Sequence, residues 1–196
     1  MTYKRLYEFS DSQDSIAIPV NGMARHAISL CDEDDIQFIK TPFETKQCLG
    51  YMRKSGTLPK PYADHDNWIV SIFYASELNT CWRRFVCTKE LMHIFDAPEA
   101  RTSTAATFER QLAELANLPL WQDTSPQTKA EFKAYWMALG VLCPLSLREI
   151  FLADYTKGLL SDYDIAIRFR VPEAYVRTMM SDQFRRSIES ILENGN

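Results

Sequence analysis

The sequence predicts an α+β protein that is mainly helical, with a small sheet packed on one central helix. Apolar residues recur at intervals of three and four through most of residues 80–192, the spacing of helices with one buried face. One earlier run, Trp68–Tyr74, joins β-branched to aromatic residues, as buried strands do. A chain of 196 residues, 46% of them hydrophobic, is long enough to build one ordinary core. We divide it into an N-terminal region of unclear role (1–62), a core (63–160) and C-terminal helices (161–196).

The first third of the chain is weakly patterned. It favours strands at Ser15–Val20 and Ile36–Lys40 and a short helix at Met23–Leu30. The acidic cluster Asp32–Asp35 is typical of a solvated turn between two elements. Turn formers and charges in Arg53–Pro61 predict an exposed loop that separates this part from the rest.

The clearest strand, Trp68–Tyr74, is followed by the clearest helix. Asn79 is a suitable helix cap, and the predicted helix Trp82–Phe95 carries aromatic and aliphatic residues on one face. Pro119, Pro144 and Gly158 then mark helix ends. The downstream helices predicted from this pattern are Thr104–Leu118, Ser125–Leu142, Leu147–Leu159 and two or three short helices within Asp162–Leu192.

Composition excludes some classes of function. A formal net charge of -4 gives no chain-wide attraction to nucleic acid or anionic membranes, although a local basic patch stays open. The five cysteines never form a Cys-x-x-Cys spacing, which fits reduced thiols in the cytoplasm. The first residues are polar, and no apolar run approaches bilayer length. We therefore expect a cytoplasmic protein that does not span a membrane.

The segment Lys89-Glu90-Leu91-Met92-His93 differs by one ligand from the His-Glu-x-x-His helix of zinc peptidases. In that motif two histidines on one helix face bind zinc, and the glutamate activates the metal-bound water. Glu90 stands at the position of this general base and His93 at the second ligand. Lys89 replaces the first ligand, and a protonated ammonium has no lone pair to offer a cation.

Three segments in the same order resemble the ImmA/IrrE family of zinc metallopeptidases. Residues 84–93 look like its Arg-Phe-Thr-Leu-Ala-His-Glu-Leu-Gly-His, and residues 131–144 resemble its Glu-x-x-Ala-x-x-Phe-Ala-x-x-Leu-Leu-Met-Pro. Residues 164–172 are similar to its Leu-Ala-x-x-Phe-x-Val-Ser, so the resemblance covers roughly residues 67–181. It implies that Glu131 occupies the third zinc-ligand position. Met92 replaces a family glycine, where a bulky side chain is expected to crowd the helix beneath.

The resemblance implies that zinc chemistry is impaired here, because Lys89 would repel the metal. Two orientations of Lys89 are open. Its ammonium either neutralises Glu131 and Glu90 in place of zinc, or it points to solvent at a decayed site. We expect no cofactor, and zinc only if another ligand restores the site. The candidates by residue type are His65, His26, Cys87 and Asp96, with Cys87 on a different helix face from His93.

These observations favour a catalytically impaired ImmA/IrrE-like protein that acts by binding a protein partner. The resemblance implies a partner class, since family members with an intact site act on helix-turn-helix repressors of phage, mobile elements or stress responses. An active zinc peptidase with a non-standard ligand is the alternative. A second alternative is a DNA-binding regulator through residues 161–180, where Pro172 would start a recognition helix. The side chains that would meet DNA are Tyr175, Arg177, Arg168, Arg170, Arg185 and Arg186.

Overall fold

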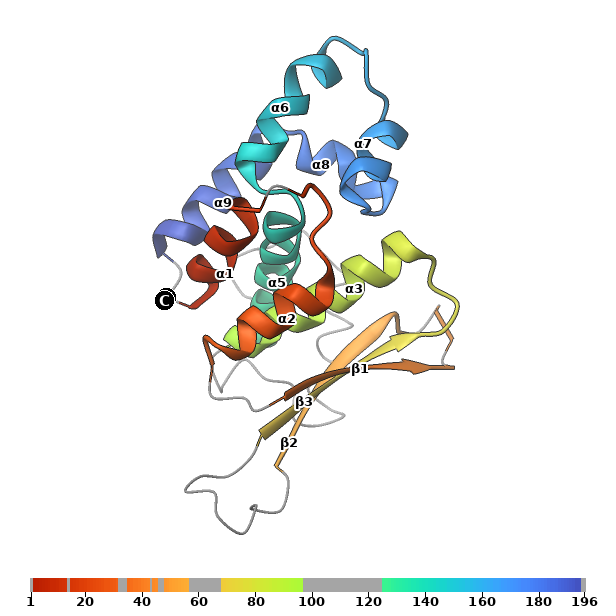
Figure 1. The fold of residues 1–196 in the computed structure, drawn as a ribbon, viewed down its shortest axis with the longest axis vertical. Helices are drawn as coiled ribbons and strands as arrows, with labels where there is room; N and C mark the ends of the chain where they lie inside the picture. The colour runs from red at the N-terminus through yellow and green to blue at the C-terminus, as the bar shows by residue number, and fades with distance from the viewer. Residues whose placement is uncertain are drawn as a thin grey trace.

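The computed structural model describes residues 2–13, 15–31, 35–42, 44–45, 48–56, 68–96 and 125–194. It confirms a mainly helical α+β protein with one small sheet (Figure 1). The predicted helix Thr104–Leu118 and His65 lie outside the described residues.

The sheet has three strands in the order β1-β3-β2. The central strand is β3 (Trp68–Ala75), which pairs in parallel with β1 (Asp35–Thr41) and antiparallel with β2 (Gly50–Gly56). Strand β3 is central because it is the most apolar of the three, with Val70 and Ile72 fully buried. This confirms the prediction for Trp68–Tyr74 and for Ile36–Lys40.

Strand β2 was not predicted. Residues 53–56 belong to this strand, whereas the charges around them indicated a loop. The strand lies at an edge of the sheet, where charged side chains are tolerated, and the Lys54 ammonium lies 5.1 Å from the centre of the Trp68 ring. Tyr51 stacks on Phe73 with ring centres 4.7 Å apart. Aromatic contacts with β3 therefore stabilise β2, although the sequence of β2 is largely polar.

Two helices precede the sheet. Helix α1 (Thr2–Asp11) was not predicted, and α2 (Val20–Ile28) begins three residues before the expected helix. The strand predicted at Ser15–Val20 is wrong. The apolar residues that suggested it, including the buried Ile18, pack a connection onto the core, and Pro19 then caps α2.

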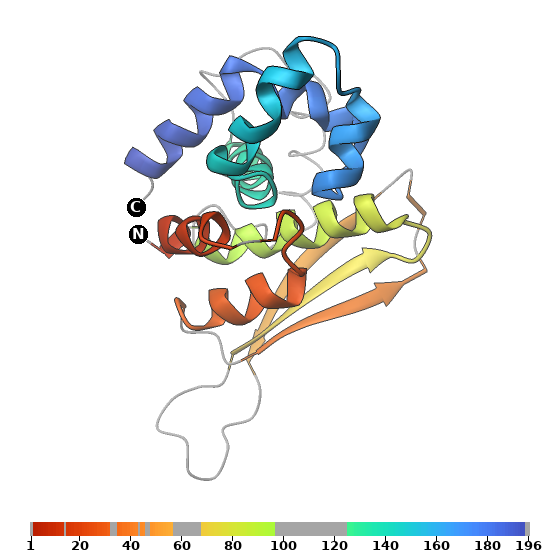
Figure 2. The same ribbon diagram turned by 45° about the horizontal axis from the view of Figure 1, so that its top comes forward.

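Helix α3 (Thr80–Met92) lies between the sheet and the C-terminal half of the helices, whereas α2 contacts both α3 and β1 (Figure 2). Its start is fixed by Asn79, whose side chain accepts a hydrogen bond from the Trp82 amide at 3.0 Å. The predicted helix Trp82–Phe95 is confirmed, except that its last residues form a 3-10 turn, η1 (His93–Phe95).

Helix α5 (Pro126–Leu142) packs on the other side of α3, as expected for Ser125–Leu142. Ser125 caps it by accepting from the Thr128 amide at 3.2 Å. The Tyr3 hydroxyl of α1 donates to the Met137 carbonyl at 3.1 Å. The N-terminal region therefore shares the core of residues 63–160.

The C-terminal helices are α6 (Leu145–Thr156), α7 (Asp162–Phe169), α8 (Val176–Met179) and α9 (Asp182–Asn194), with a 3-10 turn η3 (Glu173–Tyr175) before α8. Helix α6 begins and ends earlier than the predicted Leu147–Leu159, and the left-handed Gly158 (φ 72°) follows its end. The buried Arg148 donates to the Met179 carbonyl at 2.7 Å and so ties α6 to the turn after α8. In the described ranges no single helix is both long and apolar enough to cross a membrane, and the pair α5 and α6 meets that test jointly across a 78° bend.

Candidate functional site

The end of α3 and the start of α5 bring together the side chains singled out from the sequence. The Lys89 ammonium lies 2.6 Å from Glu131 Oε2 and 2.8 Å from Glu90 Oε1. Of the two orientations open for Lys89, the structure has the one toward the carboxylates. The Lys89 side chain is only 20% exposed, so these ion pairs are shielded from most solvent.

His93 continues the same network from the other side of Glu131. Its Nε2 lies 3.1 Å from Glu131 Oε1, in ion-pair range, although the angle does not meet hydrogen-bond geometry. Its Nδ1 lies 2.6 Å from Asp96 Oδ2, which makes this a short hydrogen bond. We call Lys89, Glu90, Glu131, His93 and Asp96 the ion-pair network.

The contacts within the ion-pair network favour the charged forms of Lys89, His93 and Glu131. Burial would lower the pKa of Lys89, but the negative charges of Glu90 and Glu131 outweigh burial and raise it well above its usual value. Burial would also lower the pKa of His93, but the contacts with Asp96 and Glu131 raise it to about 9. For Glu131 burial acts to raise the pKa, and contact with His93 and the charge of Lys89 bring it far below its usual range. Two cations therefore flank the Glu131 carboxylate at neutral pH.

These side chains do not fit a catalytic zinc ion. Such a site needs three lone-pair donors and an open position for water. The Lys89 ammonium occupies the space beside Glu131 Oε2, and both His93 nitrogens face carboxylates. In the part of the chain that the structure describes, no group of three or more His, Cys, Asp or Glu side chains is arranged to hold a metal.

The candidate replacement ligands are spread over the molecule. Asp96 contacts His93, but as its hydrogen-bond partner through Nδ1. His26 stacks on Phe9 with ring centres 4.2 Å apart, and Cys87 lines a separate pocket on α3. We did not predict the hydrogen bond between His93 and Asp96 from the sequence. The signal was available, because Asp96 follows His93 by three residues at the end of the helix.

Two further residues, Gly50 and Met92, take part in the packing around the motif helix. A Cβ on Gly50, at the start of β2, would meet Val86, lie 2.8 Å from the Phe73 carbonyl oxygen and lie 3.6 Å from Glu90 Cγ. A side chain here would collide with Val86 and the Phe73 carbonyl, so only glycine lets β2 begin this close to α3. Met92, expected to crowd the helix beneath it, is fully buried in the core between α3 and its neighbours.

The segment 161–180 forms α7, a turn and only a short α8, so the expected recognition helix has four residues preceded by the 3-10 turn η3. Tyr175 packs inward, with its ring centre 4.5 Å from that of Phe85. Arg177 pairs with Asp162 at 2.9 Å, and Arg185 pairs with Glu149 at 2.6 Å. Several side chains of the DNA-binding alternative are thus engaged within the molecule.

Comparison of the chain with protein-family models, with curated proteins and with solved structures gave no significant match.

Proposed function

We propose that this protein is a catalytically impaired homologue of the ImmA/IrrE metallopeptidases that acts by binding a protein partner. The observation that carries this proposal is the 2.6 Å contact between the Lys89 ammonium and Glu131 Oε2. The ammonium neutralises the carboxylate that the resemblance assigns to zinc.

An ammonium in this place removes both parts of the peptidase chemistry. Lys89 offers three N–H donors and no lone pair, so it attracts the carboxylates while it repels a cation. It also donates to Glu90 Oε1 at 2.8 Å, so this carboxylate accepts a hydrogen bond from a cation instead of from a water nucleophile. Glu90 then serves to balance charge, because the polarised water that a general base needs has no metal to bind.

Exposed apolar side chains on the C-terminal helices support a role in protein binding. Four large apolar side chains are more than half exposed on α6, α7 and the connection between them: Ile150, Leu159, Tyr163 and Ile167. Exposed apolar side chains that gather in one region often mark protein contacts. The resemblance suggests a helix-turn-helix repressor as the partner class, and binding without cleavage would make the protein its stoichiometric antagonist or adaptor.

The first experiment measures metal content. The purified protein, incubated with zinc and then desalted, is expected to retain no stoichiometric metal by mass spectrometry of the elements. Lys89→His, which rebuilds the three-ligand set with His93 and Glu131, is expected to retain more. Lys157→His, at an exposed position after α6, is the matched control and should behave as the unmodified protein. Stoichiometric zinc in the unmodified protein would contradict the proposal.

The second experiment separates binding from cleavage. A partner captured in the native host is purified and mixed with the protein, and its intact mass is followed together with complex formation. Binding is expected to survive a chelator and Glu90→Gln, and the partner should remain uncut. Tyr163→Lys with Ile167→Lys should weaken the complex, whereas the exposed polar control Thr156→Lys should not. Cleavage that needs added zinc and is abolished by Glu90→Gln would instead establish the active-peptidase alternative.

A further inference from the structure

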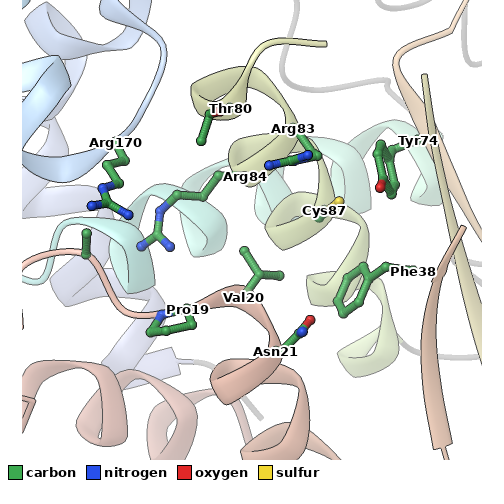
Figure 3. Close-up of a pocket in the computed structure, with 11 residues that line it drawn as sticks. Pro19, Val20, Asn21, Phe38, Tyr74, Thr80, Arg83, Arg84, Cys87 and Arg170 are labelled. Carbon is green, nitrogen blue, oxygen red and sulfur yellow. The ribbon is translucent and has the colours of Figure 1, made fainter. Parts of the chain in front are cut away.

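A pocket of about 420 Å³ lies at the opposite end of α3 from the ion-pair network (Figure 3). It is bounded by the start of α2, the first turns of α3, the sheet and the residue that follows α7. Three arginines line it, namely Arg83, Arg84 and Arg170, and none of its described lining residues is acidic. This size is ordinary for a small-molecule site.

Arg84 is the unusual member of this lining. It is 8% exposed, and one guanidinium nitrogen, Nη1, donates to the Ile18 carbonyl. Its Nε and Nη2 are buried and, within the described part of the chain, have no hydrogen-bond partner. Burial first, and then the positive charge of Arg170, lower the pKa of Arg84 to about 10. Buried donors on a charged group cost stability when they stay unpaired, so an acceptor placed against them would offset that cost.

Arg170 adds a second positive charge to the pocket, although its backbone conformation is unfavourable for arginine. It is the one described non-glycine residue with a positive φ, at 51°, a conformation that favours glycine. Its guanidinium extends to the same side of the pocket as that of Arg84 (Figure 3). Two like charges are therefore held together where the local backbone would prefer a residue without a side chain.

The start of α2 adds partial positive charge to the same space. Pro19, Val20 and Asn21 line the pocket, and α2 begins at Val20. The first N–H groups of a helix have no partner inside the helix, and they favour an anion in front of them. The first turn of α2 holds no acidic residue, and Pro19 makes no side-chain cap within the described structure.

The sheet supplies an apolar wall opposite the charges. Phe38 of β1 pairs with Ile72 of β3, and Tyr74 lies two residues beyond Ile72, so both rings project from the same face of the sheet. Both line the pocket together with Val20. The pocket thus combines a cationic end with an aromatic end.

We infer that this pocket binds a small phosphate monoester whose aromatic or apolar part lies against Phe38 and Tyr74. A phosphate offers three acceptor oxygens, enough for Arg84, Arg170 and the start of α2, which all line the pocket. A carboxylate shares this chemistry but has fewer acceptor oxygens and less charge. The inference does not depend on the proposed function, because the pocket is formed without any residue of the ion-pair network.

Isothermal titration of the full chain with four probes tests the inference. Phenyl phosphate is expected to bind at one site per chain, about tenfold more tightly than inorganic phosphate, because only the first probe also buries its ring. Benzoate should bind more weakly than phenyl phosphate, and neutral phenol should not bind measurably. No saturable binding of phenyl phosphate up to millimolar concentration would overturn the inference. Tighter binding of benzoate would overturn the assignment to phosphate.

Variants locate the binding in the pocket. Arg170→Gly removes one charge at a position whose backbone suits glycine, so the variant is expected to fold and to bind phenyl phosphate at least about tenfold more weakly. Arg84→Met should weaken binding further. Arg186→Gln, an exposed arginine on α9, removes the same charge outside the pocket and should change affinity less than about twofold. Equal losses in Arg170→Gly and Arg186→Gln would show that the attraction is general and would overturn the assignment to this pocket.

Discussion

The two ends of α3 carry shielded charge in opposite ways. At the C-terminal end, Lys89 and His93 each have a carboxylate oxygen within 3.1 Å, and Glu131 lies between the two cations. At the N-terminal end, the buried Arg84 faces a second arginine, Arg170, and two of its guanidinium nitrogens make no hydrogen bond in the described part of the chain. One helix thus joins a cluster in which each cation contacts a carboxylate to a cluster with excess positive charge.

This difference separates a structural role from a binding role. A cluster whose cations all contact carboxylates needs no bound anion to offset its positive charge. An unbalanced cluster costs stability until an anion arrives, and the bound anion recovers that cost. Removal of a positive charge at the C-terminal end of α3 should therefore lower the stability of the fold. Removal of a positive charge at the N-terminal end should change the stability little or raise it.

The largest effect is expected for Lys89→Met. It removes the ammonium that contacts both Glu90 and Glu131 and leaves His93 as the cation beside Glu131. The free energy of unfolding should therefore fall by about 3 to 4 kcal/mol in urea denaturation followed by circular dichroism. The double variant Lys89→Met with Glu131→Gln removes both charges of one pair and should recover much of this loss. Lys157→Met, at an exposed position, should change stability by less than about 0.5 kcal/mol. A single Lys89→Met variant as stable as the unmodified protein would show that the network does not stabilise the fold.

The next effect is a loss of stability at alkaline pH. The pKa of His93 is raised from 6.5 to about 9, so the folded state holds this proton more tightly than the unfolded state. The contribution is fully present below pH 6.5 and disappears as pH rises through 9. Allowing for the 12% exposure of the side chain, unfolding free energy should fall by about 2 kcal/mol over this interval. In His93→Gln the same urea series should be flat, and an equal slope in both proteins would rule out His93 as its origin.

A smaller effect is expected for Arg84→Met. The variant loses the hydrogen bond to the Ile18 carbonyl but also removes two unpaired buried donors and the repulsion from Arg170. These terms offset each other, so the free energy of unfolding should change by less than about 1 kcal/mol. A loss as large as that of Lys89→Met would remove the contrast between the two ends of α3.

The smallest effect is a gain. Arg170→Gly should raise the free energy of unfolding by about 0.5 to 1 kcal/mol, because glycine adopts the left-handed conformation at this position without strain. Arg168→Gly is the matched control two residues earlier, inside α7, and should lower it by about 1 kcal/mol. Thermal melts of both variants and the unmodified protein measure these changes. A melting temperature of Arg170→Gly below that of the unmodified protein would contradict the explanation by backbone strain.

The sequence predicted best where local pattern dominates. The helix after Asn79, the strand at Trp68 and the helix after Ser125 each carry a cap or a dense apolar run, and all three are present. Strand β2 was missed because its pairing depends on an edge position and on aromatic contacts with β3, which a local pattern does not encode.

The two charged clusters also differ in how far the local sequence predicts them. Lys89 and Glu90 lie in the last turn of α3 and His93 directly follows it, so their proximity followed from spacing, and Glu131 was added by the family resemblance. The arginine pocket could not be predicted, because Phe38, Arg84 and Arg170 are far apart in sequence and meet only through tertiary packing. Nothing local distinguishes Arg84 from Arg83, although one is buried and the other exposed.

Gly140 of α5 carries a consequence for how the chain folds during synthesis. A Cβ there would lie 2.6 Å from the Tyr3 hydroxyl and 2.8 Å from Ile188 Cδ1, so α1 and α9 meet on the same turn of α5. The core is therefore closed by contacts between the earliest and the latest described helices, and such long-range contacts form slowly. On the ribosome, α1 can pack on α2 early, but the part of α1 that contacts α5 stays uncovered until α5 has emerged. In that interval the chain depends on protection from aggregation.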